Sequence, residues 1–329
     1  MSIDTSRPGA RSESPLGAAP TAAGRNDRIT PRPHPWGVVT WAIGLILVAQ
    51  LVYILFTTPN FQWDVVGQWF LAGSVIKGLL TTLLLTVVCM AVGIVVGIVV
   101  AVLRLSRNRL LKAIAVAYIS FFRAIPVLVQ LLFWYNLAAL FPTLSVGLPF
   151  GGPAFFSVHT NDVITPFTAA ILGMGLSEAA FMAEIVRGGI LSVPPGQTEA
   201  SIALGLSRPR TFFRVVLPQA MRFIIPPTGN QVINMVKGTS LVSTIAMSEL
   251  LYSVEAVYQR TFETIPLLIV ACLWYLIVTA VLFAGQTWIE AHFAQRRPSF
   301  SFRAFVGFLP IHPRATRPRV PEPPTGGDV

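Results

Sequence analysis

The chain of 329 residues carries a formal net charge of +10, yet only 12% of its residues are charged and 53% are apolar. A typical soluble domain contains about 25% charged residues, so the composition excludes an ordinary soluble globular protein and predicts a membrane protein. The basic residues are scattered over four segments without a recognised binding motif, which argues against a nucleic-acid-binding protein.

The two ends of the chain are predicted to be disordered cytoplasmic tails. Residues 1–35 are rich in Pro, Gly, Ser, Ala and Arg and hold too few apolar residues to form a core. Residues 298–329 are rich in Pro and Arg, a composition that also predicts an unfolded segment.

Between the tails, six stretches are long and apolar enough to cross a bilayer as helices, which takes about 20 predominantly apolar residues. The first is too long, and begins too far into the chain, to be the apolar region of a signal peptide. The sequence therefore predicts an all-α integral membrane protein with six transmembrane helices. The predicted spans are residues 36–56, 78–103, 113–141, 166–185, 223–247 and 265–289.

The distribution of Lys and Arg predicts how these spans are oriented. Both tails and the segments 104–112 and 187–222 hold almost all the basic residues, whereas the three segments on the other side contribute only Lys77 and Arg260. Because cytoplasmic segments carry the excess of Lys and Arg, both termini and the segment 187–222 are predicted to be cytoplasmic.

One span is predicted to be kinked and another to be broken. Pro126 lacks a backbone N–H and is expected to kink the third span. In the fifth span, the polar run Lys237-Gly238-Thr239-Ser240 is expected to break the helix. Irregular backbone at membrane depth is tolerated where it lines a cavity or contacts another helix.

The most informative local pattern lies between the fourth and fifth spans, in residues 194–218, which we call the coupling segment. Thr198 is suited to cap a short helix there, and Gly205 is suited to the left-handed position that follows a helix. Pro218 is predicted to end a second short helix. Two short helices between membrane spans indicate a docking element.

The coupling segment resembles the coupling loop of ABC-importer permeases, in which EAA, a glycine and a Leu-Pro pair recur at fixed spacing. Here Ser201 replaces the second alanine and Val215 is the aliphatic residue before Leu-Pro. In that family the loop fits a groove on a separate ATPase subunit. The resemblance implies the same coupling role for Glu199, Ala200, Gly205, Leu217 and Pro218.

Three further stretches are similar to permeases for polar amino acids, and the likeness extends over about residues 71–294. It implies the type I ABC-importer permease fold for that domain. The family normally has five spans, so residues 36–56 are interpreted as an added N-terminal helix and residues 142–165 as an inserted outer loop. The three stretches are residues 118–130, 180–197 and 226–243.

Polar residues within the spans are candidates for a translocation path, because a charge in the membrane normally faces the protein interior or water. These candidates are Arg123, Glu178, Glu184, Asn230 and Lys237. Each charged candidate also has an alternative role. Glu184 can pair with Arg187 three residues on, and Glu178 lies among small residues suited to helix packing. Arg123 can extend to the lipid headgroups. Lys237 can be a counter-ion to Glu178 or to Glu184.

Enzyme chemistry finds no support in the sequence. No lysine follows a glycine, so the phosphate-binding loop of NTPases is absent and ATP is expected on a separate subunit. Cys89 and Cys272 fall inside spans, and the four histidines are dispersed without metal-ligand spacing. We expect no catalytic residue, no metal site and no cofactor in this chain.

The resemblance implies the membrane subunit of an ATP-driven, binding-protein-dependent importer of polar amino acids in a bacterial cytoplasmic membrane. Its implied partners are an ABC ATPase, an external solute-binding protein and a second permease subunit, identical or related. The alternative is an ion-coupled secondary transporter or a channel, which predicts repeated halves with discontinuous helices in matching positions. Only one span is strongly interrupted, and this alternative gives the coupling segment no role.

Overall fold

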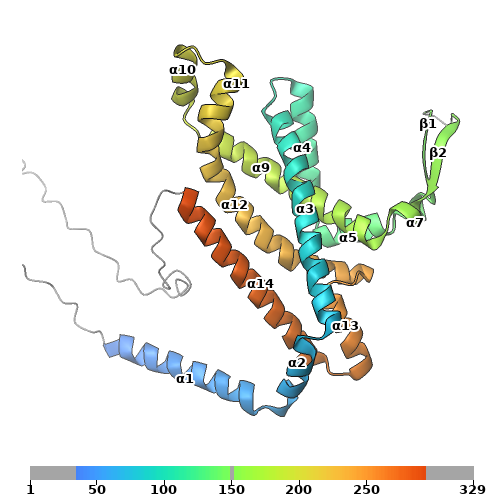
Figure 1. Cartoon of the computed structure of the whole chain (residues 1–329), viewed down its shortest axis with the longest axis vertical. Helices are drawn as coiled ribbons and strands as arrows, with labels where there is room; N and C mark the ends of the chain where they lie inside the picture. Colours follow the sequence, from blue (N-terminus) through green and yellow to red (C-terminus); the bar gives the residue numbers. More distant parts are fainter. Residues whose placement is uncertain (1–34, 149–151, 294–329) are drawn as a thin grey trace, which may run out of the picture. The chain divides into compact units, whose positions relative to one another are not determined.

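The computed structural model describes residues 35–148 and 152–293, and almost all of them are helical (Figure 1). The predicted all-α membrane fold is therefore confirmed. The predicted tails lie outside the described residues, apart from Pro35. The chain forms two compact units, Met1–Pro59 and Asn60–Val329.

Within the described residues, four helical stretches are long and apolar enough to cross a membrane, and two bent helix pairs raise the number to six if each pair is one span. These six correspond in order to the six predicted spans. The continuous stretches are Val39–Thr57, Gly73–Leu105, Pro166–Leu191 and Thr264–His292, and the bent pairs are Arg109–Ala124 with Val127–Tyr135 and Arg208–Ile245 with Leu250–Thr261.

The first unit contains helix α1 (Pro35–Thr57). Its side chains from Val39 onward are almost all exposed, and its sequence carries no charge. A helix that is apolar on all sides is suited to a lipid environment, as expected for the added N-terminal span.

Helix α3 (Gly73–Leu105) packs closely along α9 (Leu176–Leu191). Gly93 and Gly97 lie four residues apart on α3 and let the two backbones approach. A Cβ atom at Gly97 would lie 2.6 Å from the Met182 Cβ atom and 3.0 Å from the Ala179 carbonyl oxygen. Small residues at such spacing favour close helix packing in membranes.

The third predicted span is sharply bent. Helices α4 (Arg109–Ala124) and α5 (Val127–Tyr135) meet at 97°, because Pro126 forces Ile125 into an extended conformation and ends the helix. The buried Gln130 amide donates to the carbonyl oxygens of Phe122 (3.0 Å) and Ile125 (2.9 Å). The predicted kink is thus a right-angled turn whose free carbonyls are satisfied by a side chain.

The fourth predicted span is continuous but locally widened. Helix α8 (Pro166–Ala170) passes through a π-helical turn, η2 (Ile171–Gly175), into α9. Pi-helical turns inside helices often mark functional positions. The turn stands immediately before Ser177 and Glu178.

The fifth span begins earlier than predicted. Helices α11 (Arg208–Thr211), η3 (Phe212–Val216) and α12 (Leu217–Gly238) follow one another without a break, so Pro218 does not end a helix. The π-helical turn η3 lies where the missing N–H of Pro218 would interrupt the hydrogen bonds of an α-helix. The Gln219 side-chain amide donates to the Val215 carbonyl oxygen (2.9 Å).

The interruption after Lys237 is confirmed. The chain tightens into a 3-10 helix, η4 (Thr239–Ile245), and Ala246 adopts a positive φ of 55°. Helix α13 (Leu250–Thr261) then leaves at an angle, the whole pair being bent by 45°.

The remaining helices close the second unit. Helix α14 (Thr264–Phe293) packs against α12, α13 and the short α2 (Trp63–Phe70). Trp274 of α14 donates from its ring nitrogen to the Phe70 carbonyl oxygen (2.8 Å) and stacks on the Phe70 ring. The packed unit therefore begins before residue 71, the boundary suggested by the sequence.

A two-stranded antiparallel hairpin occupies the predicted outer insertion. Strands β1 (Thr143–Gly147) and β2 (Ala154–His159) extend away from the helices in Figure 1. The hairpin was not predicted. The short elements not yet given are η1 (Pro59–Phe61), α6 (Leu137–Leu140), α7 (Thr160–Val163) and α10 (Pro195–Ala203).

Candidate functional site

A cavity of about 310 Å³ lies among α5, η2, α9, α12 and η4, and we call it the Glu178 cavity. This volume is at the lower end of the range of about 300–1,000 Å³ for small-molecule sites. Its wall combines apolar side chains with a few polar groups that can orient a solute. The lining residues are Val127, Met174, Ser177, Glu178, Phe181, Gln231, Asn234, Met235, Gly238 and Leu241.

Glu178 is the ionisable group of this cavity. Its side chain is only 7% exposed, and its Oε1 atom has no hydrogen-bond partner among the described residues. Behind it, Gly93 of α3 leaves room, since a Cβ atom there would lie 2.7 Å from the Glu178 Cγ atom. A buried polar atom without a partner is costly, so this carboxylate is the candidate in the cavity for contact with a bound solute.

Arg123 lies beside the cavity without lining it. Its guanidinium carbon is 5.2 Å from the centre of the Phe181 ring, and Phe181 does line the cavity. The Arg123 side chain is exposed, so a cation–π contact of this kind contributes about 0.5–1 kcal/mol. The guanidinium therefore lies close to the cavity wall, and both alternatives for Arg123 stay predictions.

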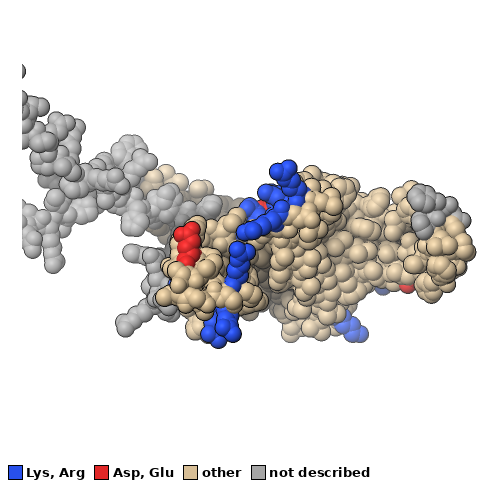
Figure 2. Space-filling model, turned by 90° about the horizontal axis from the view of Figure 1, so that it is seen from above, with Lys and Arg blue, Asp and Glu red and all other residues tan. Residues whose placement is uncertain are grey.

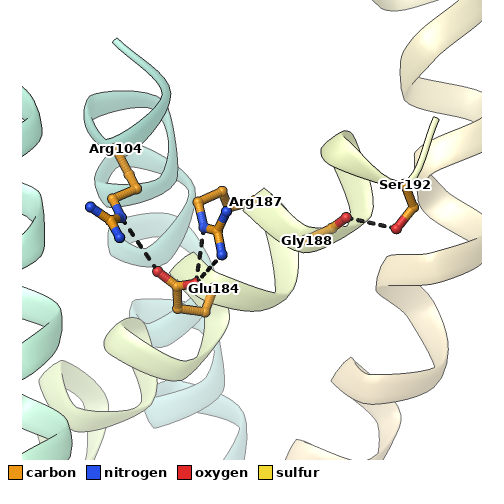
Figure 3. A network of polar contacts seen from close by, with 5 residues as sticks. All are labelled: Arg104, Glu184, Arg187, Gly188 and Ser192. Atoms are coloured by element: carbon orange, nitrogen blue, oxygen red, sulfur yellow. Dashed lines mark hydrogen bonds and ion pairs between the residues drawn. The ribbon is translucent and has the colours of Figure 1, made fainter. Parts of the chain in front are cut away.

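Glu184 takes part in an ion-pair network instead of the cavity (Figure 3). Its carboxylate accepts from Arg187 Nη2 (2.6 Å) and Nε (2.9 Å) on the same helix, and lies 3.6 Å from Arg104 of α3. The pairing of Glu184 with Arg187, given above as an alternative, is therefore present. The contact of Glu184 with Arg104 was not predicted. The network ties the ends of α3 and α9 together just before the coupling segment.

Asn230 and Lys237 also lie outside the cavity wall. The Asn230 Oδ1 atom accepts from the Gln286 amide of α14 (3.2 Å), and its neighbours Gln231 and Asn234 line the cavity instead. Lys237 is exposed, and the ion pairs among the described residues all involve Glu184 with Arg104 or Arg187. The suggestion that Lys237 is a counter-ion to Glu178 or Glu184 is therefore wrong.

The coupling segment forms two helical elements at one end of the second unit (Figure 1). Helix α10 begins with Pro195 in its first turn, so Thr198 lies inside the helix and does not cap it. Proline suits that position because its missing N–H would have no partner there. Ser207 does stand at the cap position of α11, although its side chain accepts no capping hydrogen bond.

Gly205 adopts the predicted left-handed conformation, with φ at +83°. Its N–H donates to the Ile202 carbonyl oxygen (2.9 Å), and the Leu206 N–H donates to the Ser201 carbonyl oxygen (3.1 Å). This pair of bonds is the Schellman motif, which satisfies the last carbonyls of a helix. Only glycine adopts this backbone conformation without strain.

The surface of the coupling segment is open and partly apolar. Glu199, Ala200, Gly205 and Pro218 are exposed, and Leu204 is 84% exposed, whereas Leu217 is half-buried. Figure 2 looks onto this end and shows Lys and Arg side chains gathered on it. Exposed apolar side chains bordered by charges mark protein interaction sites.

The sequence analysis missed a second buried carboxylate. Glu249 is fully buried at the N-cap of α13, where it accepts hydrogen bonds from the Tyr252 N–H (2.8 Å), the Thr82 hydroxyl (3.2 Å) and the Tyr275 hydroxyl (3.0 Å). It joins α3, α13 and α14 at the break in the fifth span. An acidic residue immediately before an apolar helical run was the available signal.

No group of three or more His, Cys, Asp or Glu side chains suited to a metal lies within residues 35–148 and 152–293. The Glu178 cavity combines polar lining groups with a volume of about 310 Å³, as a site for a small solute requires.

Comparisons with known proteins agree with this arrangement. Residues 93–295 match the family described as "Binding-protein-dependent transport system inner membrane component". The chain is 40% identical over 281 residues to the arginine transport system permease protein ArgU of Corynebacterium glutamicum, covering 84% of this chain and 85% of ArgU. It is 34% identical to the glutamine transport system permease protein GlnP of Escherichia coli, covering 68% of this chain and 93% of GlnP.

A solved structure extends the likeness to the fold. The chain is similar to a protein in the "Crystal structure of an amino acid ABC transporter with histidines", with a TM-score of 0.57 and 29% identity. The match covers 67% of this chain and 94% of that chain. The predicted resemblance to ABC-importer permeases is thereby confirmed.

Proposed function

Because the chain belongs to the family of binding-protein-dependent transport system inner membrane components, we propose that it conducts a polar amino acid through the Glu178 cavity. The chain is a permease subunit and not an enzyme. The observation that carries the proposal is the buried, unpartnered Oε1 atom of Glu178 in a cavity with Ser177, Gln231 and Asn234.

The chemistry of the cavity favours a solute with a positive group. Every polar group of its lining except Glu178 is neutral, so Glu178 is the one lining side chain that can carry a charge opposite to that of a cationic solute. An ammonium or guanidinium group of the solute would supply the missing partner of the carboxylate. The relative ArgU is named for arginine transport and supports this inference.

The coupling segment is proposed to dock a separate ABC ATPase, with Glu199, Ala200, Gly205, Leu217 and Pro218 at the contact. Its exposed position at one end of the unit and its apolar Leu204 support this role. ATP is bound and hydrolysed by that partner, and this chain carries no cofactor. The Arg104–Glu184–Arg187 network holds the helix that leads into the docking site.

An external solute-binding protein delivers the amino acid, and a second permease subunit, identical or related, completes the pathway. The exposed Arg123 supports the second subunit. A charged side chain on the surface of a membrane span is costly unless protein or water covers it. We therefore place the second subunit against the side of the cavity that carries Arg123 and Phe181.

The basic end of the second unit is proposed to face the cytoplasm, as the excess of Lys and Arg there indicates. A cysteine at Ser207, in the coupling segment, should react with a membrane-impermeant thiol reagent only after permeabilisation. A cysteine at Ser145, in the hairpin, should react in intact cells. Reaction of both cysteines in intact cells would contradict this orientation.

The function is tested by reconstitution of the permease with its ATPase in vesicles supplied with the external binding protein. Uptake of labelled arginine should require ATP and the binding protein together. Uptake driven by an ion gradient in the absence of ATP would instead indicate a secondary transporter. Equal uptake of acidic, neutral and basic amino acids would leave ATP-driven import standing but reject the preference for a positive group.

A further inference from the structure

In its regular part, residues 143–146 and 156–159, the hairpin β1–β2 has one apolar face and one polar face. In the observed register, Leu144 lies opposite Val158 and Val146 lies opposite Phe156, and paired residues share a face of the sheet. On the other face, Ser145 lies opposite Ser157 and Thr143 lies opposite His159. This alternation is typical of a sheet with one buried face and one face in water.

Nothing within the described residues covers the outer half of the apolar face. Val146 is 69% exposed and Phe156 is 64% exposed. Phe155 lies at the irregularity near the tip and has no partner in the register, so it is not counted in this face. Two isolated strands are marginally stable in water. A layer outside this chain is therefore needed to bury the apolar face.

The hairpin is held beside the membrane spans. The Thr160 N–H donates to the Pro142 carbonyl oxygen (3.0 Å) and the Thr160 hydroxyl donates to the Phe141 carbonyl oxygen, so the two feet of the hairpin are tied together. The fourth span begins a few residues later, at Pro166. Leu140 and Phe141, which immediately precede the hairpin, are also exposed.

We propose that the apolar face of the hairpin, formed by Leu144, Val146, Phe156 and Val158, rests on the outer surface of the lipid bilayer. Residues 124–161 contain no Lys, Arg, Asp or Glu, whereas protein partners are usually matched by complementary charges and a polar rim. Four side chains are also few for a protein interface, which takes about 800 Å² on each partner.

The depth of the hairpin is limited by its backbone. Both strands are edge strands, because the sheet has only two, and their outer N–H and C=O groups need water or headgroups. The hairpin therefore lies in the interfacial region, where aromatic residues such as Phe156 are accommodated. The hydroxyls of Ser145 and Ser157 face the aqueous side.

The test compares two adjacent positions on opposite faces, Phe156→Cys and Ser157→Cys, in full-length protein with Cys89→Ala and Cys272→Ala. Each cysteine receives an environment-sensitive fluorophore, and the permease is reconstituted in phosphatidylcholine vesicles. The fluorophore at 156 should emit at shorter wavelength and be quenched by lipids with a brominated chain. The fluorophore at 157 should be quenched by aqueous iodide instead.

Equal quenching of both positions by iodide would overturn the proposal, because the hairpin would then stand free in water. Protection of position 156 from both iodide and brominated lipid would also overturn it, since a protein would then cover the face. Both labelled proteins should elute as a single peak at the volume of the unlabelled protein, which checks that they are folded. None of these measurements needs transport, so their outcome is independent of the proposed function.

Discussion

Replacement of Gly205 by Asp is expected to abolish solute uptake while the protein still inserts into the membrane. Gly205 has a φ of +83° and no atom within 4 Å of the position that a Cβ atom would take. The loss therefore does not arise from a clash within the chain. It arises from backbone strain of about 1–2 kcal/mol and from an unpaired charge placed on the docking surface for the ATPase.

Two further substitutions at the same position separate these causes. Gly205→Ala adds only the strain and should reduce uptake without abolishing it. Gly205→Asn should retain more uptake than Gly205→Ala, since asparagine tolerates the left-handed conformation and carries no charge. The measurements are uptake, the amount of protein in the membrane and the amount of ATPase that copurifies.

A matched control places the same new charge elsewhere. Gly67, on α2, is exposed, has an ordinary φ and has open space around its Cβ position. Gly67→Asp should retain uptake and ATPase binding. Normal uptake by a well-expressed Gly205→Asp protein would refute the assignment of residues 194–218 as the coupling segment.

Replacement of Glu178 by Gln is expected to reduce uptake of a positively charged amino acid by about tenfold or more. A hydrogen bond to a charged group contributes about 1.5–3 kcal/mol, and 1.4 kcal/mol corresponds to a factor of ten. Glutamine keeps the shape of the side chain and removes its charge. Uptake of neutral amino acids should fall less, so the preference among solutes should change.

The stability of the Glu178→Gln protein distinguishes a solute-binding role from a structural one. Among the described residues no ion pair includes Glu178, and its Oε1 atom lacks a partner. Loss of the charge should therefore leave the melting temperature unchanged or raise it. A lower melting temperature together with unchanged solute preference would assign Glu178 to the scaffold. The Glu184→Gln variant, which breaks the ion-pair network outside the cavity, should not alter solute preference.

The sequence was sufficient for the membrane class, the six candidate spans and the left-handed turn at Gly205. These features depend on local properties: the length of apolar runs and the positions of Gly and Pro. Gly205 is a clear example, since its left-handed backbone follows from residue type and helix position alone. The break after Lys237 was also visible as a run of polar and small residues.

Other local signals were overridden by the surrounding helix. Pro218 was expected to end a helix, but a π-helical turn lies just before it and the helix continues. Thr198 was expected to cap a helix, but the helix already begins at Pro195. The hairpin was missed because its strands are short and are separated by a loop rich in Gly and Pro. Local propensity is a weak predictor wherever packing offers an alternative.

Only the tertiary structure decided which polar residues meet. Glu178, Gln231 and Asn234 line one cavity, although α9 and α12 are far apart in the sequence, whereas Glu184, Asn230 and Lys237 lie elsewhere. Glu184 pairs with Arg104 across two helices, and Glu249 reaches Thr82 and Tyr275. The side chains that a helix carries can be read from the sequence. Which of these side chains face one another depends on how the packed helices rotate and cross. Rotation and crossing are set by contacts between distant residues, which local patterns do not show.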